Sequence, residues 1–298
     1  MTSTDPNTHV DKRGPRVLRR EPGVAEIKPR AHVRNRKAAE RALAVGVPAV
    51  LLLIWQLAHH YEWNLLGYWK IDQRFYASPY EIVTSEKLRE ADFWRDVWTS
   101  TRRMLIGFAL GAGAGVFIGL TMGMSRLIRA ALDPLLTALY TVPKLALLPL
   151  FLTIFGFDER PRVMLIAVTV FFFVWISTMA AIMAVPEGYR EAAMSFGVSR
   201  WQMFRHVLLP GSLPQIFVGL RIAAGVAVLI LIGVELVIPS QGGIGSLIER
   251  GRTLLIPELT YVGIALAALL GLLFTLVVRW IGRLLIPWAP EDNAPGQG

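Results

Sequence analysis

The stretch that decides the fold is Glu191–Pro214, EAAMSFGVSRWQMFRHVLLPGSLP. It is a polar interruption between two apolar segments, each long enough to cross a bilayer. Pro186, just before it, can open a short helix, because the first position of a helix has no N–H bond to lose. Gly197 can close that helix in the left-handed conformation, which glycine adopts without strain. The stretch therefore predicts two short helices joined at a glycine.

The second short helix has its own start and stop signals. Ser199 and Gln202 form the S-x-x-Q pattern of a capping box. Pro210 is expected to end the helix, because proline lacks the N–H that a continuing helix needs. Three residues at spacings of three and four are expected to hold it against the bundle: Trp201, Phe204 and Leu208. This elbow outside the membrane is typical of a docking surface for another protein.

Outward from the elbow, the chain is a series of long apolar runs. It has 298 residues, no cysteine and a mean hydropathy of +0.47. The sequence predicts an all-α integral membrane protein with about six transmembrane helices, and the elbow lies between the fourth and the fifth. The expected spans are 42–63, 104–124, 133–155, 163–185, 215–238 and 259–285. Without cysteine, disulfides and thiolate metal sites are excluded.

The two ends of the chain are polar. Residues 1–41 carry 11 Lys and Arg against 5 Asp and Glu, which indicates a basic, largely disordered arm that favours anionic lipid rather than nucleic acid. Residues 286–298 are expected to form a polar tail. Six spans place both termini on one side, and the basic arm favours the cytoplasmic side. We therefore expect a multi-pass protein of a prokaryotic plasma membrane with both termini cytoplasmic.

The connection after the first span carries a helix-start signal. Ser78, Pro79 and Glu81 combine an N-cap, a first-position proline and a third-position glutamate. A surface helix is expected to begin there. Four apolar residues share one side of a helical continuation, which predicts a segment lying on the membrane before the chain turns in: Phe93, Trp94, Val97 and Trp98.

The second span contains overlapping G-x-x-x-G units. Its regularly spaced glycines are Gly107, Gly111, Gly115, Gly119 and Gly123. In lipid, such a stripe lets another helix approach to van der Waals contact with the backbone. A tightly packed structural helix is favoured over a pore-lining role, and either interpretation places this face against protein.

The third span is expected to begin at a cap formed by Asp133 and Pro134 and to be interrupted by Pro143 and Pro149. Lys144, between those prolines, is a functional candidate, because charged residues inside spans usually are. The alternative is a lysine that reaches the interface past the helix break. Five residues are candidates for the translocation path: Lys144, Pro143, Pro149, Ser177 and Glu235.

The connection between the fifth and sixth spans is expected to be flexible at Gly242-Gly243-Ile244-Gly245. Glu235 precedes this connection near the far end of the fifth span. It is placed either at the membrane interface or deeper in the span.

Enzymatic chemistry is not expected. No lysine directly follows a glycine, so the chain lacks the G-x-x-x-x-G-K-[ST] loop that holds ATP phosphates. The five histidines lack metal-ligand spacing, and the adjacent pair His59-His60 does not share a helix face. We expect no catalytic residue, no metal site and no cofactor on this chain.

The elbow resembles a known family signature. Glu191-Ala192-Ala193, Gly197 and Val207-Leu208-Leu209-Pro210 match the EAA-x3-G-x9-I-x-L-P loop of ABC importer permeases, with valine in place of isoleucine. The resemblance covers about residues 75–285. Further motifs resemble the nitrate/sulfonate/taurine/bicarbonate subgroup: Ser78-Pro79, 141–150 (TVPKLALLPL), Glu235-Leu236 and 242–245 (GGIG).

The resemblance implies a division of labour. Two permease subunits, expected as a homodimer, would face each other above two separate ATPase subunits that bind ATP and Mg²⁺. The elbow would act as a coupling helix, and a solute-binding protein would deliver cargo from outside. The residues implied in ATPase coupling are Glu191, Ala192, Ala193, Gly197, Arg200, Leu209 and Pro210.

The cargo implied by the resemblance is a small anion such as an organic sulfonate, taurine or nitrate. Relatives that carry pyrimidine or vitamin-like solutes leave a second possibility open. An ATP-independent secondary transporter is the less favoured class, because no second broken span matches the third.

Overall fold

A computed structural model describes residues 31–61, 64–65, 69–70, 76–238 and 242–288. It comprises two units, residues 1–53 and residues 54–298. Helix α1 (Ala31–His60) begins in the first unit and ends in the second, and its apolar part is Ala42–His60. The predictions for residues 1–30 and 289–298 lie outside the described residues.

In the described residues of the second unit, the secondary structure is helical apart from one short strand pair, in which β1 (Asn64–Leu65) lies antiparallel to β2 (Trp69–Lys70). The helices are α2 (Pro79–Thr84), η1 (Glu86–Arg89), α3 (Ala91–Met124), α4 (Arg126–Tyr140), η2 (Lys144–Leu147), α5 (Leu148–Phe155), α6 (Arg160–Met183), α7 (Glu187–Ser195), α8 (Arg200–Met203), the π-helical turn η3 (Phe204–Leu208), α9 (Leu209–Val237), α10 (Ile244–Thr253) and α11 (Pro257–Leu285).

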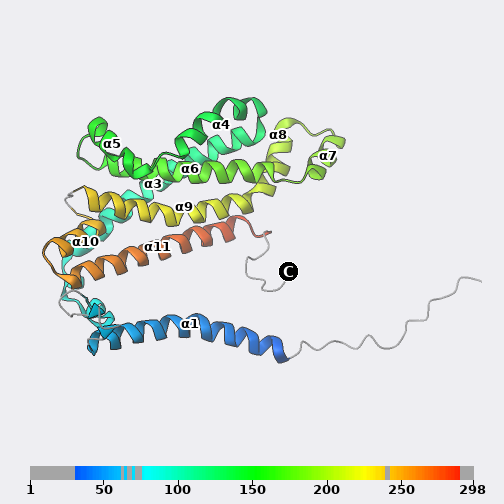
Figure 1. The fold of residues 1–298 in the computed structure, drawn as a ribbon. Coiled ribbons are helices and arrows are strands. Elements are labelled where there is room, and N and C mark those ends of the chain that lie inside the picture. The colour runs from blue at the N-terminus through cyan, green and yellow to red at the C-terminus, as the bar shows by residue number, and fades with distance from the viewer. Residues whose placement is uncertain (1–30, 62–63, 66–68, 71–75, 239–241, 289–298) are drawn as a thin grey trace, which may run out of the picture. The chain divides into compact units, whose positions relative to one another are not determined.

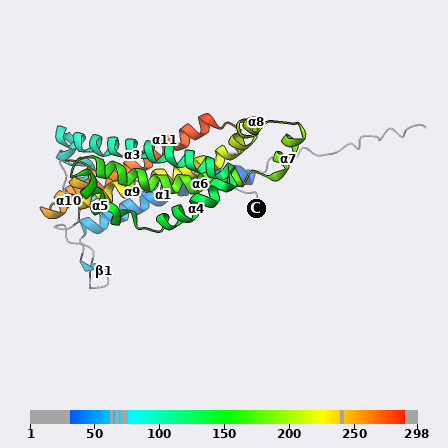
Figure 2. The same ribbon diagram turned by 90° about the horizontal axis from the view of Figure 1, so that it is seen from above.

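Helices α3, α6, α9 and α11 run side by side (Figure 1). Both views place α7 and α8 at one end of these helices, here called the elbow end, and α5 and α10 at the other, here called the α10 end (Figure 2). Among the described residues, five helices are long and apolar enough to cross a membrane, and the bent pair α4 with η2–α5 makes a sixth candidate. This agrees with the predicted all-α membrane fold.

The connection before α3 differs in part from the prediction. The capping box at α2 is confirmed, since Ser78 Oγ accepts from Glu81 N–H and the Glu81 carboxylate accepts from Ser78 N–H. The prediction that the segment around Phe93 lies on the membrane surface before the chain turns in is wrong, because α3 is one unbroken helix from Ala91. No proline or glycine interrupts its first turns, and Phe93 is buried against α10 and α11.

The third predicted span is also different. Its helix α4 begins at Arg126, where Ser125 Oγ accepts a hydrogen bond from Ile128 N–H, so the predicted cap at Asp133 is wrong and Pro134 lies inside the helix. The chain then bends by 90° between Tyr140 and Lys144. Pro143, which directly precedes η2, explains the bend, because proline lacks the N–H that a continuing helix needs. Pro149 lies beyond the bend in the first turn of α5, where no helical hydrogen bond is lost.

The glycines of α3 lie directly against α6. A Cβ added at Gly107 would lie 2.7 Å from Ile166 Cβ, and one at Gly123 would lie 2.7 Å from Ile182 Cβ. At Gly111 it would collide with the carbonyl oxygen of Ala167. Gly115 and Gly119 make equally close contacts with the same helix. The two helices are therefore in backbone contact along most of the length of α6.

The core continues from this pair to α9 and α11. Its buried side chains are Met104, Ala112, Ile166, Val170, Val174, Ala223, Ala224, Ala227, Val228, Leu231, Phe274 and Val278. Helix α9 approaches α6 at Gly219, where an added Cβ would collide with the side chain of Ser177. Small residues at both contacts let the three helices pack as one body, with their ends at the elbow end and the α10 end.

Candidate functional site

At the elbow end, α7 closes as the sequence predicts. Gly197 has φ +71°, and its N–H donates to Met194 O at 2.9 Å, while Val198 N–H donates to Ala193 O at 3.4 Å. This pair of bonds is a Schellman motif with glycine in the left-handed position. An added Cβ at Gly197 meets no heavy atom within 4 Å, so glycine is required for its backbone conformation and not for space.

Helix α8 begins with the predicted capping box. Ser199 Oγ accepts from Gln202 N–H at 3.3 Å, and Gln202 Oε1 accepts from Ser199 N–H at 2.8 Å. The predicted stop at Pro210 is wrong. A π-helical turn precedes it, in which Leu209 N–H donates to Phe204 O, and helix α9 then continues through Pro210. In the wider turn, a backbone N–H donates to the carbonyl five residues earlier instead of four. This change falls directly before Pro210, which has no N–H to donate.

The π-turn also changes which side chains hold the elbow to the bundle. Leu208 is buried and Phe204 is half-buried, as expected. Trp201, however, is 63% exposed, so its predicted packing role is wrong. Met203 takes that place and packs with Leu208, because the extra residue in the turn rotates the preceding helix relative to α9.

The elbow presents side chains outward. Phe196 is 86% exposed beside Gly197, and Tyr189, Met194 and Trp201 are exposed as well. Glu191, Ala192 and Arg200, predicted to contact an ATPase, also lie on the surface. Ala193 does not, since it is 8% exposed. The structure therefore corrects the prediction that Ala193 contacts an ATPase. One side of α7 must face the rest of the chain, and Ala193 lies on that side.

One hydrogen bond ties the elbow to the bundle. Arg190 Nη2 in α7 donates to Ile182 O in the last turn of α6 at 2.8 Å. The terminal carbonyls of a helix lack partners within the helix, and a cation there also complements the helix dipole. Arg190 was not identified as a site residue from the sequence. The only cue to its role was its position between a membrane span and the elbow.

Lys144 lies at the bend between α4 and η2. Its Nζ donates to Tyr140 O at 2.6 Å, to Val142 O at 2.7 Å and to Leu139 O at 3.3 Å. It also lies 4.6 Å from the ring centroid of Phe172. The lysine therefore satisfies the carbonyls of Tyr140 and Val142 at the helix break, while that of Leu139 also accepts from Val142 N–H.

The other candidates for the translocation path are spread apart. Pro143 and Pro149 flank Lys144 on the exposed side of the bend. Ser177 Oγ donates to Phe173 O one turn earlier in α6, at 2.7 Å. Glu235 forms its hydrogen bonds with Ser100, Arg103 and Gly245 rather than with any of these candidates, in a buried polar network at the α10 end.

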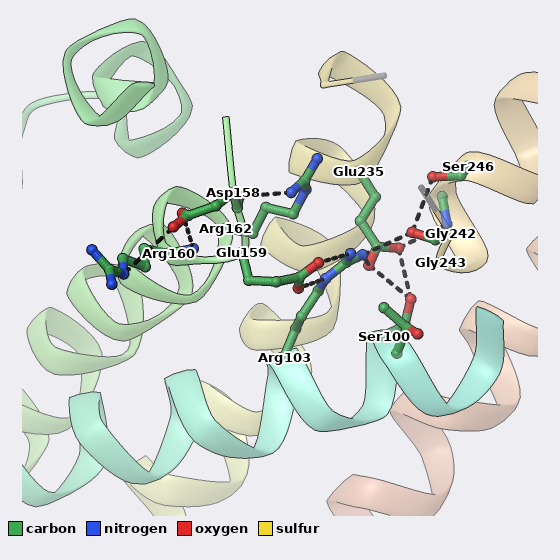
Figure 3. A network of polar contacts seen from close by, with 12 residues as sticks. Ser100, Arg103, Asp158, Glu159, Arg160, Arg162, Glu235, Gly242, Gly243 and Ser246 are labelled. Carbon is green, nitrogen blue, oxygen red and sulfur yellow. Dashed lines mark hydrogen bonds and ion pairs between the residues drawn. The ribbon is translucent and has the colours of Figure 1, made fainter. Parts of the chain in front are cut away.

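The network has Arg103 at its centre (Figure 3). Arg103 Nη1 lies 2.6 Å from Glu235 Oε1, and Arg103 Nε and Nη2 donate to the Glu159 carboxylate at 2.5 and 2.6 Å. Ser100 Oγ lies 2.8 and 2.7 Å from the two Glu235 oxygens. Arg162 lies beside the cluster and donates to Asp158 O at 2.8 Å. The buried Glu235 carboxylate is therefore paired with the buried Arg103 cation, as a buried charge requires, whereas the Glu159 side chain is 46% exposed.

Glu159 is the member of the network that lies outside the candidate spans, at the N-cap of α6. The hydrogen bonds from Arg103 lower the pKa of the Glu159 carboxyl below its ordinary value, and partial burial opposes this effect. The carboxylate therefore stays charged and keeps Arg103 paired on its second side.

The connection to α10 is packed where the sequence predicted flexibility. Within the described part, Gly243, Ile244 and Gly245 are buried. Gly243 N–H donates to Asp96 Oδ1 at 2.9 Å, and Gly245 N–H donates to Glu235 Oε2 at 2.9 Å. The glycines are therefore close-contact positions rather than hinges. Sequence reasoning missed Ser100, Arg103 and Glu159, although oppositely charged residues near the ends of neighbouring spans were visible.

The fold and the elbow define a polytopic helical membrane protein with exposed apolar side chains on two short helices at one end. The chain belongs to the family of binding-protein-dependent transport system inner membrane components, which matches residues 111–289. It is an ABC importer permease, as are its relatives. It is 32% identical over 258 residues, 84% of this chain and 90% of the relative, to the taurine transport system permease protein TauC of Escherichia coli.

Two further relatives extend this picture. The aliphatic sulfonates transport permease protein SsuC of Escherichia coli is 36% identical over 246 residues, 82% of this chain and 90% of the relative. The nitrate import permease protein NrtB of Synechococcus elongatus is 32% identical over 196 residues, 63% of this chain and 68% of the relative.

Solved structures show the same fold. The inward-facing MetNI methionine ABC transporter matches with a TM-score of 0.56 at 20% identity, over 64% of this chain and 94% of the solved chain. A bacterial ABC transporter involved in alginate import matches with a TM-score of 0.55 at 18% identity, over 85% of this chain and 99% of the solved chain. At these identities the likeness concerns the fold alone.

Proposed function

We propose that this chain forms the membrane path of an ATP-driven importer and receives its driving force through the α7–α8 elbow from a separate ATPase subunit. The observation that carries the proposal is the exposure of Phe196 and Trp201 at the elbow, 86% and 63%. Large aromatic side chains contribute strongly to protein interfaces when they are buried by a partner. The elbow therefore has the character of a docking surface.

The residues of the elbow divide into two roles under this proposal. Glu191, Ala192, Gly197 and Arg200 face outward and would contact the ATPase. Ala193, Leu209 and Pro210 lie toward the bundle and would support the elbow from behind, as Arg190 does through its bond to α6. A force applied at the elbow would then reach α6 and, through the glycine contact, α3.

The remaining subunits follow from the same division. The sequence lacks a phosphate-binding loop, so ATP and Mg²⁺ would bind to the partner and no cofactor to this chain. The assembly would contain two ATPase subunits, a second copy of this permease and a solute-binding protein on the outer side. The elbow and both termini would be cytoplasmic, and the α10 end would face outward.

A small organic sulfonate is the cargo that we favour. The names of the relatives TauC and SsuC give taurine and aliphatic sulfonates, and that of NrtB gives nitrate. All three are small molecules with an anionic oxygen group. Nitrate is therefore the second candidate, while pyrimidine or vitamin-like solutes find no support among these relatives.

Docking is tested by co-purification with the co-expressed ATPase. The tagged permease should retain the ATPase, and the double variant Phe196→Ser/Trp201→Ser should lose it. A matched control is Leu254→Ser, which also removes an exposed apolar side chain but at the α10 end. ATPase retention by the double variant would contradict the proposal, as would uptake that persists without the ATPase.

Cargo is tested by uptake. Vesicles containing the permease, the ATPase and the binding protein should accumulate ³⁵S-labelled taurine or ethanesulfonate in the presence of ATP. Unlabelled sulfonates should compete for uptake, and nitrate should not. Competition by nitrate alone would assign the second candidate instead.

A further inference from the structure

The Arg103 side chain joins four separate parts of the chain. It extends from α3, and its Nη1 donates to Glu235 in α9 at 2.6 Å and to Gly242 O before α10 at 2.9 Å. Its Nε and Nη2 donate to Glu159 at the start of α6. All three guanidinium nitrogens are used. The planar fork of arginine makes this possible, and a lysine ammonium offers only one nitrogen.

The first turn of α10 closes on the same cluster. Three consecutive N–H groups, those of Gly243, Ile244 and Gly245, donate to Asp96 Oδ1, Ser100 Oγ and Glu235 Oε2 at 2.9, 2.8 and 2.9 Å. A helix start has N–H groups without partners in the helix, and carboxylates are favourable there. Helix α10 is therefore attached to α3 and α9 through its own N-terminus.

The attachment leaves no free space. A Cβ added at Gly242 would lie 2.5 Å from Asp96 Oδ1, and one at Gly243 would lie 2.6 Å from Glu235 Oε1. At Gly245 it would collide with Glu235 Cβ. A second ion pair, between Arg250 Nη2 and Asp96 Oδ2 at 2.5 Å, ties the middle of α10 to α3.

A buried ion pair is a poor means of adding stability, because removing its charges from water costs about as much as their attraction returns. In some proteins such a pair instead fixes geometry, because few arrangements satisfy both charges, and this is the role that we infer here. Arg103 also lies one turn before Gly107, at the end of the stretch over which α3 and α6 are in backbone contact. The network therefore lies where α10 contacts the end of the α3–α6 pair, so a movement of that pair would reach α10 through the network.

We propose that Arg103 is a positioning residue for transport, which holds α10 and the start of α6 to α3 so that the α10 end moves together with the elbow end. This inference rests on the proposed function, because the movement that it transmits is the one that ATP produces at the elbow. Without Arg103, ATP would still move the elbow, but α10 would be held only by its contacts with Asp96, Ser100 and Glu235, would follow less closely, and part of the hydrolysis would be wasted.

The first test needs no ATPase. The natural chain has no cysteine, so spin labels can be placed at Arg95→Cys on α3 and Arg252→Cys on α10, both exposed. Labelled chains are mixed with an excess of unlabelled chains, so that each measured distance lies within one chain. A single narrow distance distribution is expected with Arg103, and a broad one with Arg103→Met. Arg103→Lys, which keeps the charge but loses the fork, provides a second variant in case the first does not fold. An equally narrow distribution in a folded variant would overturn the proposal.

The second test measures transport per ATP in the reconstituted complex. In Arg103→Lys the ratio of cargo imported to ATP hydrolysed should fall about twofold to thirtyfold, the range for residues that act on coupling between sites. A merely destabilised protein would lose both activities together, so an unchanged ratio contradicts the inference. A spin label at Gly188→Cys, an exposed position of α7 outside the proposed ATPase contact, separates the two hypotheses. If that label fails to respond to the ATPase even with Arg103 present, the proposed docking is wrong, while the first test still decides the role of Arg103.

Discussion

Arg103 Nη1 lies 2.6 Å from Glu235 Oε1, and the two side chains are 1% and 0% exposed. The residues are 132 positions apart in the sequence, on α3 and α9. Their pairing, together with the elbow at the opposite end, gives the permease two specialised ends connected by a tightly packed helical core. The following predictions test each part of this arrangement.

Removing Arg103 should strongly destabilise the protein. Arg103→Met leaves Glu235 charged and buried without its cation, which typically costs about 3–5 kcal/mol. Thermal unfolding in detergent measures the loss as a lower midpoint. The control Arg252→Met removes an exposed arginine paired with Glu249, and its midpoint should hardly change. Equal midpoints for the two variants would contradict a buried ion pair at Arg103.

Two neighbouring glycines of α3 should respond oppositely to the same change. A Cβ at Gly111 collides with the backbone of α6, whereas one at Gly113 meets nothing within 4 Å. Gly111→Ala should therefore destabilise the protein by about 1–3 kcal/mol through overpacking. Gly113→Ala should stabilise the helix by up to about 1 kcal/mol. Unfolding midpoints of the two variants provide the comparison, and a midpoint for Gly111→Ala as high as that of Gly113→Ala would show that α3 and α6 are not in backbone contact.

Gly197 should be sensitive to alanine through its backbone alone. Its φ of +71° costs an L-residue about 1–2 kcal/mol, although the surrounding space is open. Gly197→Ala should shift the elbow geometry and weaken ATPase binding in a pull-down titration. Gly188→Ala, in the helical part of α7 and also with open space, is the matched control and should bind normally. Normal binding by both variants would show that the left-handed turn is not required.

Lys144 should matter for stability and not for cargo affinity. Lys144→Met leaves the carbonyls of Tyr140 and Val142 without their donor, at a cost of about 1–3 kcal/mol. The unfolding midpoint should fall while the KM for cargo uptake stays the same. A large rise in KM without a loss of stability would instead place Lys144 in the anion path. Lys87→Met, at an exposed lysine, controls for loss of charge.

The stability of the protein should depend on acid through Glu159. The pKa of this carboxyl is lowered in the folded protein by its hydrogen bonds from Arg103. The stabilisation of the folded state by the ionised Glu159 is therefore complete at pH values above the ordinary pKa of 4.5. It is lost as the pH falls through the lower pKa of the folded protein. Unfolding midpoints of the unmodified protein and of Glu159→Gln should differ at neutral pH and converge below that window. A difference that grows on acidification would contradict the pairing with Arg103.

Much of the fold could be predicted because it depends on local chemistry. The length of the apolar runs, the turn at Gly197 and the capping boxes at Ser78 and Ser199 each require only neighbouring residues. The errors arose where a local signal competed with its neighbours. Pro210 should end a helix, but a π-turn before it removes the conflict. Asp133-Pro134 should begin one, but Ser125 is an earlier cap.

The candidate site was predictable at one end only. The elbow is contiguous in sequence, so its pattern was visible, although which of its side chains face inward was not. Glu235 was singled out as a charge in an apolar segment, yet its hydrogen-bond partners come from positions 100 and 103 on α3 and from position 245 on α10. No spacing in the sequence relates these positions to one another.

The sequence by itself therefore determined the membrane class, the number of apolar segments and the elbow, because hydropathy, proline and glycine act over a few residues. Only the tertiary structure decided that Lys144 closes a helix end, that Gly243 and Gly245 at the start of α10 are buried, and that Arg103 and Glu235 meet. The physical reason is that these features depend on how helices pack against one another. Burying a charge is tolerable only when packing brings its partner to it.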